Sequence, residues 1–216
     1  MRCHVFGLTG GIGTGKTTVA ARFRARRLPV LDADELSRAA VMPNTPGFAA
    51  VVAEFGAEVV AADGTLDRAK LARVVFHDLS LRKKLENIVH PFVHSTLEVE
   101  IRRLELREEP LACYEAPLLV ETGTADIYRP LVVVHAPKDV RVVRSMHRDG
   151  MEEHQVQARM ESQAPQSTKL RLADHVIDNA SELEKTIEEA DIVLDKICVS
   201  LSIDPARYPK PPQDAA

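Results

Sequence analysis

The chain has 216 residues, a length that suits one domain or one domain carrying an insertion. Hydrophobic residues make up 45% of it and charged residues 28%, which excludes collagen-like and disordered classes. The formal net charge is -4, so no overall positive field is available to hold a nucleic-acid backbone, and we expect no nucleic-acid partner.

The N-terminus and the cysteines indicate a cytoplasmic protein without a membrane segment. Residues 1–8 form a strand-like run that lacks the long apolar region and cleavage site of a signal peptide. No apolar run approaches the roughly 20 residues that a membrane-spanning helix needs. Cys3, Cys113 and Cys198 are odd in number and widely spaced, which predicts buried thiols rather than a disulfide framework.

A glycine cluster follows the first predicted strand. The mostly apolar run Cys3–Thr9 is typical of a buried strand, and it leads directly into Gly10–Thr17, which satisfies the pattern G-x-x-x-x-G-K-[ST]. A helix is predicted over Thr17–Arg27, ended by Pro29. The strand, loop and helix together are the context that a phosphate-binding loop requires.

The chemistry of this loop predicts a nucleoside triphosphate with Mg²⁺. Gly11, Gly13 and Gly15 lack a Cβ, so backbone N–H groups can surround the phosphates. Lys16 can reach the outer phosphates, and the Thr17 hydroxyl can ligate the metal. A glycine-rich turn that binds nothing is the alternative, but it gives no reason for the Lys-Thr pair. The guanine motif N-K-x-D and the switch motif D-x-x-G are absent from the sequence.

Two carboxylates end the second predicted strand, Val30–Asp34. If this segment is extended, Asp32 and Asp34 point the same way, where they could orient or deprotonate an attacking hydroxyl, or hold Mg²⁺ through water. The alternative is that they cap the next helix, with Asp34 as its N-cap.

A helical insertion is predicted over residues 35–109, because short amphipathic patterns replace buried strands there. Its longest apolar pattern runs on both sides of Pro91, where we expect a kink or a restart. His90 and His94 are four residues apart without a third metal ligand nearby, so His90 is interpreted as a structural or substrate-pocket residue rather than a zinc ligand.

The sheet resumes with Leu111–Ala116, Leu131–Ala136 and the weaker candidate His175–Asp178. Strands separated by helices predict a parallel sheet with right-handed crossovers. Glu115 lies near a strand end, where a carboxylate could reach the water shell of the metal. Glu121 could equally be a surface residue.

The segment after the valine-rich strand is predicted to carry a lid. Val140–Asp149 reads as a helix with three arginines on one face: Arg141, Arg144 and Arg148. An arginine closing over a transferring phosphoryl group neutralises its charge. We place the lid at about residues 144–171, with Gly150 as a hinge and Arg159 on a second helix. A solvated basic face is the alternative for Arg144 and Arg148.

The C-terminal part contains the clearest helix of the chain. Between Leu183 and Leu201, apolar residues recur at steps of three and four, a stripe that should close the core. The proline-rich tail 205–216 is expected to be disordered. The expected nucleotide-binding core therefore comprises residues 1–34 and 110–204.

Several short motifs, in this order, resemble those of the dephospho-CoA kinase family, and the resemblance extends from Gly7 to about Leu201. They are G-L-T-G-G-I-G-T-G-K-T-T at Gly7–Thr18, D-A-D at Asp32–Asp34, F-G at Phe55-Gly56, D-G-T-L-D-R at Asp63–Arg68, H-P at His90-Pro91, P-L-L-V-E at Pro117–Glu121, R-D at Arg148-Asp149, and A-D-H-V-I-D-N at Ala173–Asn179.

The resemblance implies an α/β fold of the P-loop kinase type, with a parallel sheet flanked by helices, a helical CoA-binding insertion and a mobile lid. It implies ATP with Mg²⁺ as donor and the ribose 3′-hydroxyl of dephospho-CoA as acceptor. Asp34 then corresponds to the base and Arg148 to a γ-phosphate contact, while Asp178 and Asn179 lie near the adenine of ATP. Glu115 departs from the family, in which Asp is frequent, and this weakens its assignment.

The expected site residues fall into four groups. The catalytic residues are Lys16, Asp34 and Arg148. The nucleotide is expected to contact Gly11, Gly13, Thr14, Gly15, Lys16, Thr17, Thr18, Arg144, Asp178 and Asn179. The acceptor is expected to contact Thr9, Asp34, His90 and Leu118, and the metal to contact Thr17 and, through water, Asp32.

Two other functions stay open at this point. One is a small-molecule kinase for a nucleoside or a sugar on the same core. The other is a nucleotide-dependent switch whose bound state is recognised by a partner. For the kinase we expect a monomer or a weak homo-oligomer.

Overall fold

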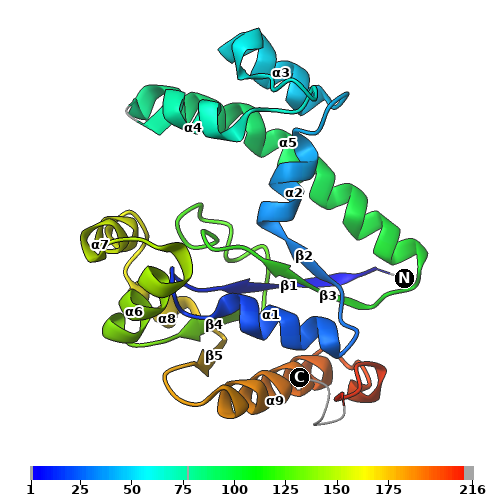
Figure 1. Cartoon of the computed structure of the whole chain (residues 1–216). Helices are drawn as coiled ribbons and strands as arrows, with labels where there is room; N and C mark the ends of the chain where they lie inside the picture. The colour runs from blue at the N-terminus through cyan, green and yellow to red at the C-terminus, as the bar shows by residue number, and fades with distance from the viewer. Residues whose placement is uncertain (1, 77, 212–216) are drawn as a thin grey trace. The chain divides into compact units, whose positions relative to one another are not determined.

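The structure, a computed structural model, describes residues 2–76 and 78–211 (Figure 1). The chain divides into two compact units, of which the first comprises Met1–Val30 with Glu108–Ala216 and the second Leu31–Arg107. None of the helices in the described ranges is both long enough and apolar enough to span a bilayer.

A five-stranded sheet organises the first unit. Its strands are β1 (His4–Thr9), β2 (Val30–Asp32), β3 (Leu111–Glu115), β4 (Leu131–His135) and β5 (His175–Asp178). Their order is β2-β3-β1-β4-β5, and β2 crosses the boundary between the units. β1 pairs in parallel with β3 and β4, and β4 pairs in parallel with β5. The α/β fold class with a parallel sheet and flanking helices is therefore confirmed, including the weaker strand candidate β5.

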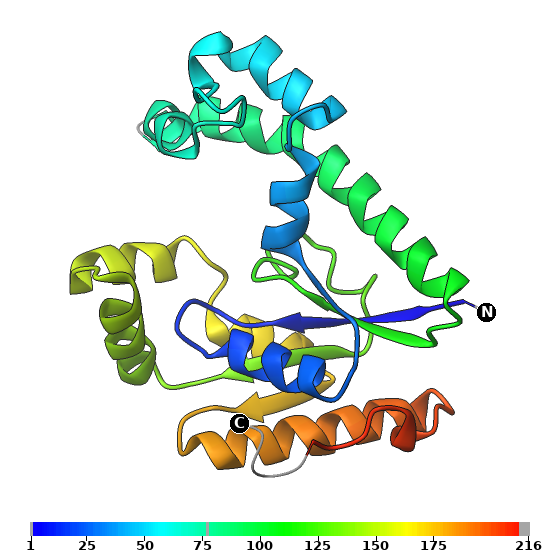
Figure 2. The ribbon, with the colours of Figure 1, turned by 45° about the vertical axis from the view of Figure 1, so that its right-hand side comes forward.

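The central strands of the sheet are buried because helices cover them. Every residue of β3 is buried, as a strand covered on both faces requires. Helices α1 (Lys16–Ala25) and α9 (Leu183–Ser200) pack side by side, as Figures 1 and 2 show. Phe23 of α1 and Leu194 of α9 belong to one hydrophobic cluster with Phe6 of β1. Of the predicted stripe of α9, Ala190, Leu194 and Ile197 are buried, Ile187 and Leu201 are partly buried, and Leu183 at its start is exposed.

Three helices follow β4: α6 (Lys138–Asp149), α7 (Glu153–Glu161) and α8 (Gln166–Leu172). Gly150 ends α6 in the left-handed conformation with φ 63°, which glycine adopts without strain. α7 packs against α6, and α8 packs against β4.

The second unit is helical. It contains α2 (Ala33–Ala40), α3 (Pro46–Phe55), the 3-10 turn η1 (Ala57–Val59), α4 (Arg68–Phe76) and α5 (Leu79–Leu106). α2, α3 and α4 all pack on α5, and Val51 and Val59 are fully buried in its core. α5 continues through Pro91, so the restart considered there does not occur. Tertiary packing along a helix of this length compensates for the hydrogen bond that proline cannot make.

The segment after α9 corrects the expectation of a disordered tail. Pro205–Arg207 form the 3-10 turn η2, and Tyr208 is 1% exposed. Buried Arg26 donates to the Tyr208 carbonyl oxygen at 2.9 and 2.7 Å, while the Tyr208 hydroxyl donates to Glu109 at 2.5 Å. A buried guanidinium needs such acceptors, so the chain folds back onto α1 and residues 205–211 are ordered. Residues 212–216 lie outside the described part.

Candidate active site

The predicted phosphate-binding loop connects β1 to α1 and has the backbone that its glycines predict. Gly13 and Gly15 have φ of 75° and 82°, in the left-handed region. A Cβ at Gly13 would collide with the Arg141 carbonyl oxygen, and one at Gly15 with the Asn179 side-chain nitrogen. Both glycines are therefore required by conformation and by space.

Residues from several elements hold the loop. The buried Thr14 hydroxyl donates to the Gly11 carbonyl oxygen at 2.9 Å. The Asn179 side-chain amide donates to the Thr14 carbonyl oxygen and accepts from the Thr186 hydroxyl, each at 2.9 Å. Asn179, expected near the adenine from the family resemblance, thus uses its side chain to fix the loop to β5 and α9. Neighbouring Asp178 is exposed and caps the following turn by accepting from Ala180 N–H.

Lys16 and Glu115 meet beside the loop. The Lys16 ammonium donates to Glu115 Oε1 at 2.7 Å, and Glu115 is 2% exposed. Glu115 stands opposite Leu8 in the parallel pairing of β3 with β1, so strand register places it next to the loop. Its second oxygen lies 3.6 Å from Arg24 and accepts no hydrogen bond from a described residue. This position suits the weak sequence assignment of Glu115 to the surroundings of a metal.

The residues here fit a bound Mg²⁺. This ion prefers oxygen ligands and keeps several of its waters, so one hydroxyl and one carboxylate suffice on the protein side. Thr17 lies in the first turn of α1 with an exposed side chain, and Glu115 Oε2 is a buried carboxylate oxygen without a hydrogen-bond donor among the described residues.

The three arginines of α6 have different partners although they share a face. Arg141 is buried and donates to the Ile12 carbonyl oxygen of the loop at 2.9 Å, and burial lowers its pKa. Arg144 donates to the Asn179 carbonyl oxygen at 2.8 Å. Arg148 is exposed and pairs with Asp149, whose carboxylate raises the pKa of the guanidinium. Of the three, Arg141 is buried, Arg144 is half-buried and Arg148 is exposed.

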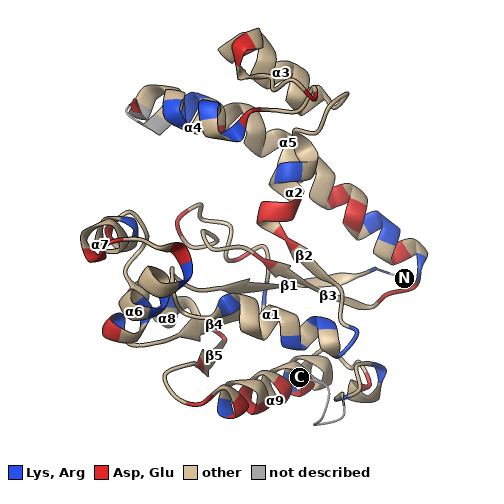
Figure 3. Cartoon of the chain, viewed as in Figure 1, with Lys and Arg blue, Asp and Glu red and all other residues tan. Residues whose placement is uncertain are grey.

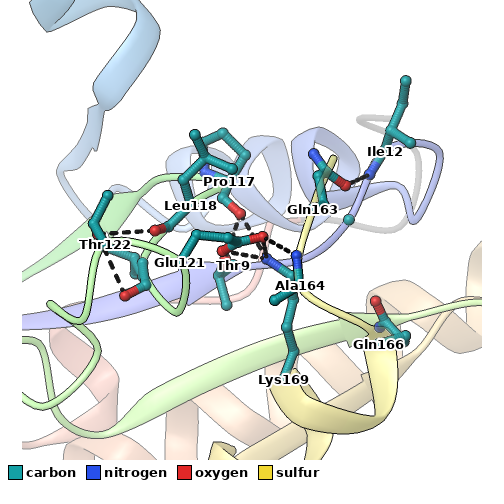
Figure 4. A network of polar contacts seen from close by, with 12 residues as sticks. Thr9, Ile12, Pro117, Leu118, Glu121, Thr122, Gln163, Ala164, Gln166 and Lys169 are labelled. Carbon is teal, nitrogen blue, oxygen red and sulfur yellow. Dashed lines mark hydrogen bonds and ion pairs between the residues drawn. The ribbon is translucent and has the colours of Figure 1, made fainter. Parts of the chain in front are cut away.

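The turn after β3 is held by a buried lysine that the sequence analysis missed (Figure 4). Lys169 of α8 is 0% exposed, and its ammonium donates to the Pro117 carbonyl oxygen at 2.9 Å and to both Glu121 oxygens at 2.7 and 2.8 Å. Burial lowers the pKa of Lys169, and the Glu121 carboxylate opposes this shift. The Thr9 hydroxyl also donates to Pro117, at 3.2 Å, and Leu118 is exposed.

Glu121 is consequently no ordinary surface residue, since its side chain is only 17% exposed and neutralises a buried cation. The pair joins residues 48 positions apart, and neither periodicity nor a motif relates them. A lysine in a short amphipathic segment gives no sequence signal of burial.

The second unit contains Asp32, Asp34 and His90. Asp32 ends β2 and caps α2 by accepting from the Asp34 and Glu35 N–H groups at 2.7 and 3.2 Å. The extended segment Val30–Asp34 was therefore predicted two residues too long, and the cap is Asp32 rather than Asp34. Asp34 is exposed in the first turn of α2, where Figure 3 shows acidic residues gathered. His90 is exposed on α5.

Comparison with known proteins agrees with this arrangement. A family model described as dephospho-CoA kinase matches residues 4–185. A dephospho-CoA kinase from Anaeromyxobacter dehalogenans is 47% identical over 191 residues, covering 88% of this chain and 90% of that protein. One from Syntrophotalea carbinolica is 41% identical over 185 residues, with 86% and 88% covered.

Solved structures share the fold. A crystal structure from Thermus thermophilus matches with a TM-score of 0.78 and 37% identity, over 91% of this chain and 99% of that one. A dephospho-CoA kinase from Campylobacter jejuni matches with a TM-score of 0.69 at 24% identity, over 91% and 98%, which supports the fold alone. With a family model spanning most of its length and relatives above 40% identity, the chain belongs to the dephospho-CoA kinase family.

Proposed function

We propose that the chain transfers the γ-phosphoryl group of ATP to the ribose 3′-hydroxyl of dephospho-CoA, giving ADP and coenzyme A. The observation that carries this proposal is the loop of Gly10–Thr17, with its two left-handed glycines and Lys16 at the start of α1, in a chain of this family. The N-terminus of α1 adds a positive dipole end that favours a phosphate.

The nucleotide is held mainly by the loop. Backbone amides and side chains in the segment from Gly11 to Thr18 surround the phosphates: Gly11, Gly13, Thr14, Gly15, Lys16, Thr17 and Thr18. When ATP binds, its phosphates compete with Glu115 for the Lys16 ammonium. On the nucleoside side we place Arg144 of α6, Asp178 of β5 and Asn179, which follows β5.

Magnesium would be held by Thr17 directly and by Asp32 through water. Glu115 is a further outer ligand, suggested by its buried Oε2 atom, which accepts no hydrogen bond from a described residue. The ion supplies neutralisation of the charge on the β- and γ-phosphate oxygens. The same Asp32 carboxylate caps α2 through its Oδ1 atom.

The transfer itself depends on positioning and electrostatics. The Asp34 carboxylate accepts the proton of the 3′-hydroxyl, the oxygen forms a bond to the γ-phosphorus, and the bond to the β-phosphate oxygen breaks. Arg148 neutralises charge on the transferring group. Thr9, His90 and Leu118 complete the acceptor side. Phosphoryl transfer of this kind needs no covalent intermediate on the protein.

The remaining parts follow the same proposal. The helical second unit, close to the expected insertion at 35–109, binds the CoA moiety, and residues 144–171 form a lid that excludes water. We also infer a cytoplasmic location, where thiols stay reduced, because all three cysteines are buried thiols rather than disulfides. A monomer or a weak homo-oligomer remains the proposed state.

Release of ADP on adding dephospho-CoA tests the proposal. Wild type should release ADP and form a product phosphorylated on the 3′-oxygen, identified by mass spectrometry against coenzyme A. Lys16→Ala, Asp34→Asn and Arg148→Ala should each lose most activity. Full activity of Asp34→Asn would remove the proposed base. A panel of nucleoside monophosphates and sugars separates the rival kinases, since preference for one of them would contradict the acceptor proposed here.

A further inference from the structure

The connection between α7 and α8, residues 162–165, makes polar contacts to two segments outside these helices through two consecutive residues. Gln163 Oε1 accepts from the Ile12 N–H of the phosphate loop at 3.0 Å. The Ala164 N–H donates to Glu121 Oε1 at 2.9 Å. Figure 4 shows both contacts together with Lys169, which lies beneath the Glu121 carboxylate. The connection thus joins the phosphate loop to the turn after β3.

The other side of Ile12 is also fixed, because its carbonyl oxygen accepts from Arg141. Gln163 is half-buried, and its Oε1 would lie 3.2 Å from a Cβ placed on Gly11. Its side-chain NH₂ group donates to no residue in the described ranges. An amide whose oxygen is held by the loop therefore presents two N–H donors from the side of the predicted lid.

The ion pair behind this amide is costly for a protein to bury. Lys169 is fully buried, and its charge is offset by three oxygens, two from Glu121 and one from Pro117. Replacing such a pair by apolar residues of similar volume is often neutral for stability, so stability alone does not explain it. What the pair does fix is the position of Ala164 and, with it, Gln163.

We propose that Gln163 binds the terminal phosphate of ATP through its side-chain NH₂ group, and that Glu121 and Lys169 are positioning residues that hold it there. The inference deepens the proposed function and rests on it. The amides at the start of α1 face the inner phosphates, whereas Ile12 lies earlier in the loop and is approached from α7 and α8. Gln163 therefore distinguishes ATP from ADP.

Binding of ADP and of a non-hydrolysable ATP analogue to the full chain with Mg²⁺, measured by calorimetry, tests this without the acceptor. In Gln163→Met, the Kd for the ATP analogue should rise about tenfold, the loss of one hydrogen bond, while the Kd for ADP changes less than about twofold. Gln163→Glu should weaken the analogue further, because a carboxylate would face the phosphate. The matched control is Gln157→Met on α7, whose amide bonds only to Glu153 among the described residues and should leave both affinities unchanged.

The positioning role is tested with Glu121→Met combined with Lys169→Met. This variant should raise the Kd for the ATP analogue but not the Kd for ADP, with little change in Tm. Adding Gln163→Met should raise the Kd for the analogue no further, because both changes act through one contact. Should the double variant fail to fold, Glu121→Gln keeps an acceptor for Lys169 and should still weaken only the ATP analogue, by about threefold.

Equal weakening of both nucleotides by Gln163→Met, or none, overturns the phosphate contact. Multiplication of the two losses in the combined variant overturns the positioning role. Failure of the proposed function looks different. The variants would then still weaken binding of the ATP analogue more than binding of ADP, but the wild type would phosphorylate no dephospho-CoA.

Discussion

The phosphate loop and the start of α2 are both places where a strand gives way to a helix, yet they are stabilised in different ways. The loop depends on distant residues, because Arg141, Asn179 and Gln163 bond to its backbone. The start of α2 is capped by Asp32, within three residues of itself. A substitution far along the chain can therefore remove a hydrogen bond of the loop, while the cap of α2 is lost by a change at Asp32 itself.

This difference separates two kinds of site residue. Around the loop, most polar side chains already form hydrogen bonds with protein atoms, so only a few of them are available for the reaction. At the start of α2, one carboxylate serves the fold and the next one, Asp34, is exposed. Two acidic residues of one short motif, separated by Ala33, thus differ in what they do for the fold, and substitutions can tell them apart.

The largest expected effect is at the loop. Lys16→Met should lower kcat/KM for ATP about 10³-fold, because a preorganised positive charge on the transferring phosphoryl group is lost. Steady-state ADP release measures it. Lys138→Met, at the exposed first residue of α6, is the matched control and should stay at the wild-type rate. A loss below about tenfold in Lys16→Met would contradict the proposed role.

At α2, the two carboxylates should differ in their effect on stability. Asp34→Asn should lower kcat about 10²- to 10⁴-fold with an unchanged Tm, since a general base is lost from an exposed position. Asp32→Ala should lower activity and also the free energy of unfolding, the latter by about 1 kcal/mol, because the cap of α2 is lost together with the proposed water-mediated contact to Mg²⁺. Thermal unfolding and ADP release on both variants decide it. A lowered Tm in Asp34→Asn would break the distinction between the two residues.

A smaller effect tests the remote support of the loop. Asn179→Ala leaves the Thr14 carbonyl oxygen and the Thr186 hydroxyl without this partner, which should cost about 1–3 kcal/mol of stability and also weaken ATP binding. Denaturant unfolding and nucleotide titration measure the two losses. Asn87→Ala on the exposed face of α5 is the control. Stability lost without any change in ATP binding would show that the loop does not depend on β5.

The smallest effect concerns Tyr208, whose carbonyl oxygen accepts from Arg26 at the C-terminal end of α1 and whose hydroxyl donates to Glu109. Burial and the Glu109 carboxylate raise the pKa of Tyr208, while an unfolded chain has a tyrosine pKa of about 10. The stability from this hydroxyl is therefore complete below pH 10 and declines above it, by about 1.4 kcal/mol per pH unit. Urea unfolding between pH 8 and pH 11 measures the decline.

Tyr208→Phe should remove this part of the alkaline decline and leave the part due to cysteine. Burial raises the pKa of Cys198 to about 11, so its thiol also stays protonated in the folded chain where the unfolded one ionises. The wild-type and Tyr208→Phe curves should therefore differ in slope only above about pH 10. Parallel curves over the whole range would mean that the Tyr208 hydroxyl is not buried in solution.

The sequence predicted those features that depend on neighbouring residues. Strand β1, the loop and α1 follow from an apolar run, glycines and a Lys-Thr pair within about fifteen positions, and the stripe of α9 follows from its period. The prediction of an extended segment up to Asp34 was wrong, because an extended strand and a capped helix are both compatible with D-A-D until the cap is known.

Features that depend on residues far apart in the chain could not be predicted. The pairing of Lys169 with Glu121 and that of Arg26 with Tyr208 arise only after the strands and helices have packed. Both bury a cation, and sequence patterns assign cations to the surface by default. The roles of the proposed site residues likewise stay predictions until substrates are bound.

Because β1 is hydrogen bonded to β3 on one side and to β4 on the other, the phosphate loop inherits its place from strand alignment. Deleting a single residue within His4–Thr9 would shift that alignment by one step and turn each following side chain to the opposite face of the sheet. Gly10 and the loop residues after it would then be displaced from their present positions. For this family of enzymes, the length of strand β1 thus matters for nucleotide binding as much as the glycines themselves do.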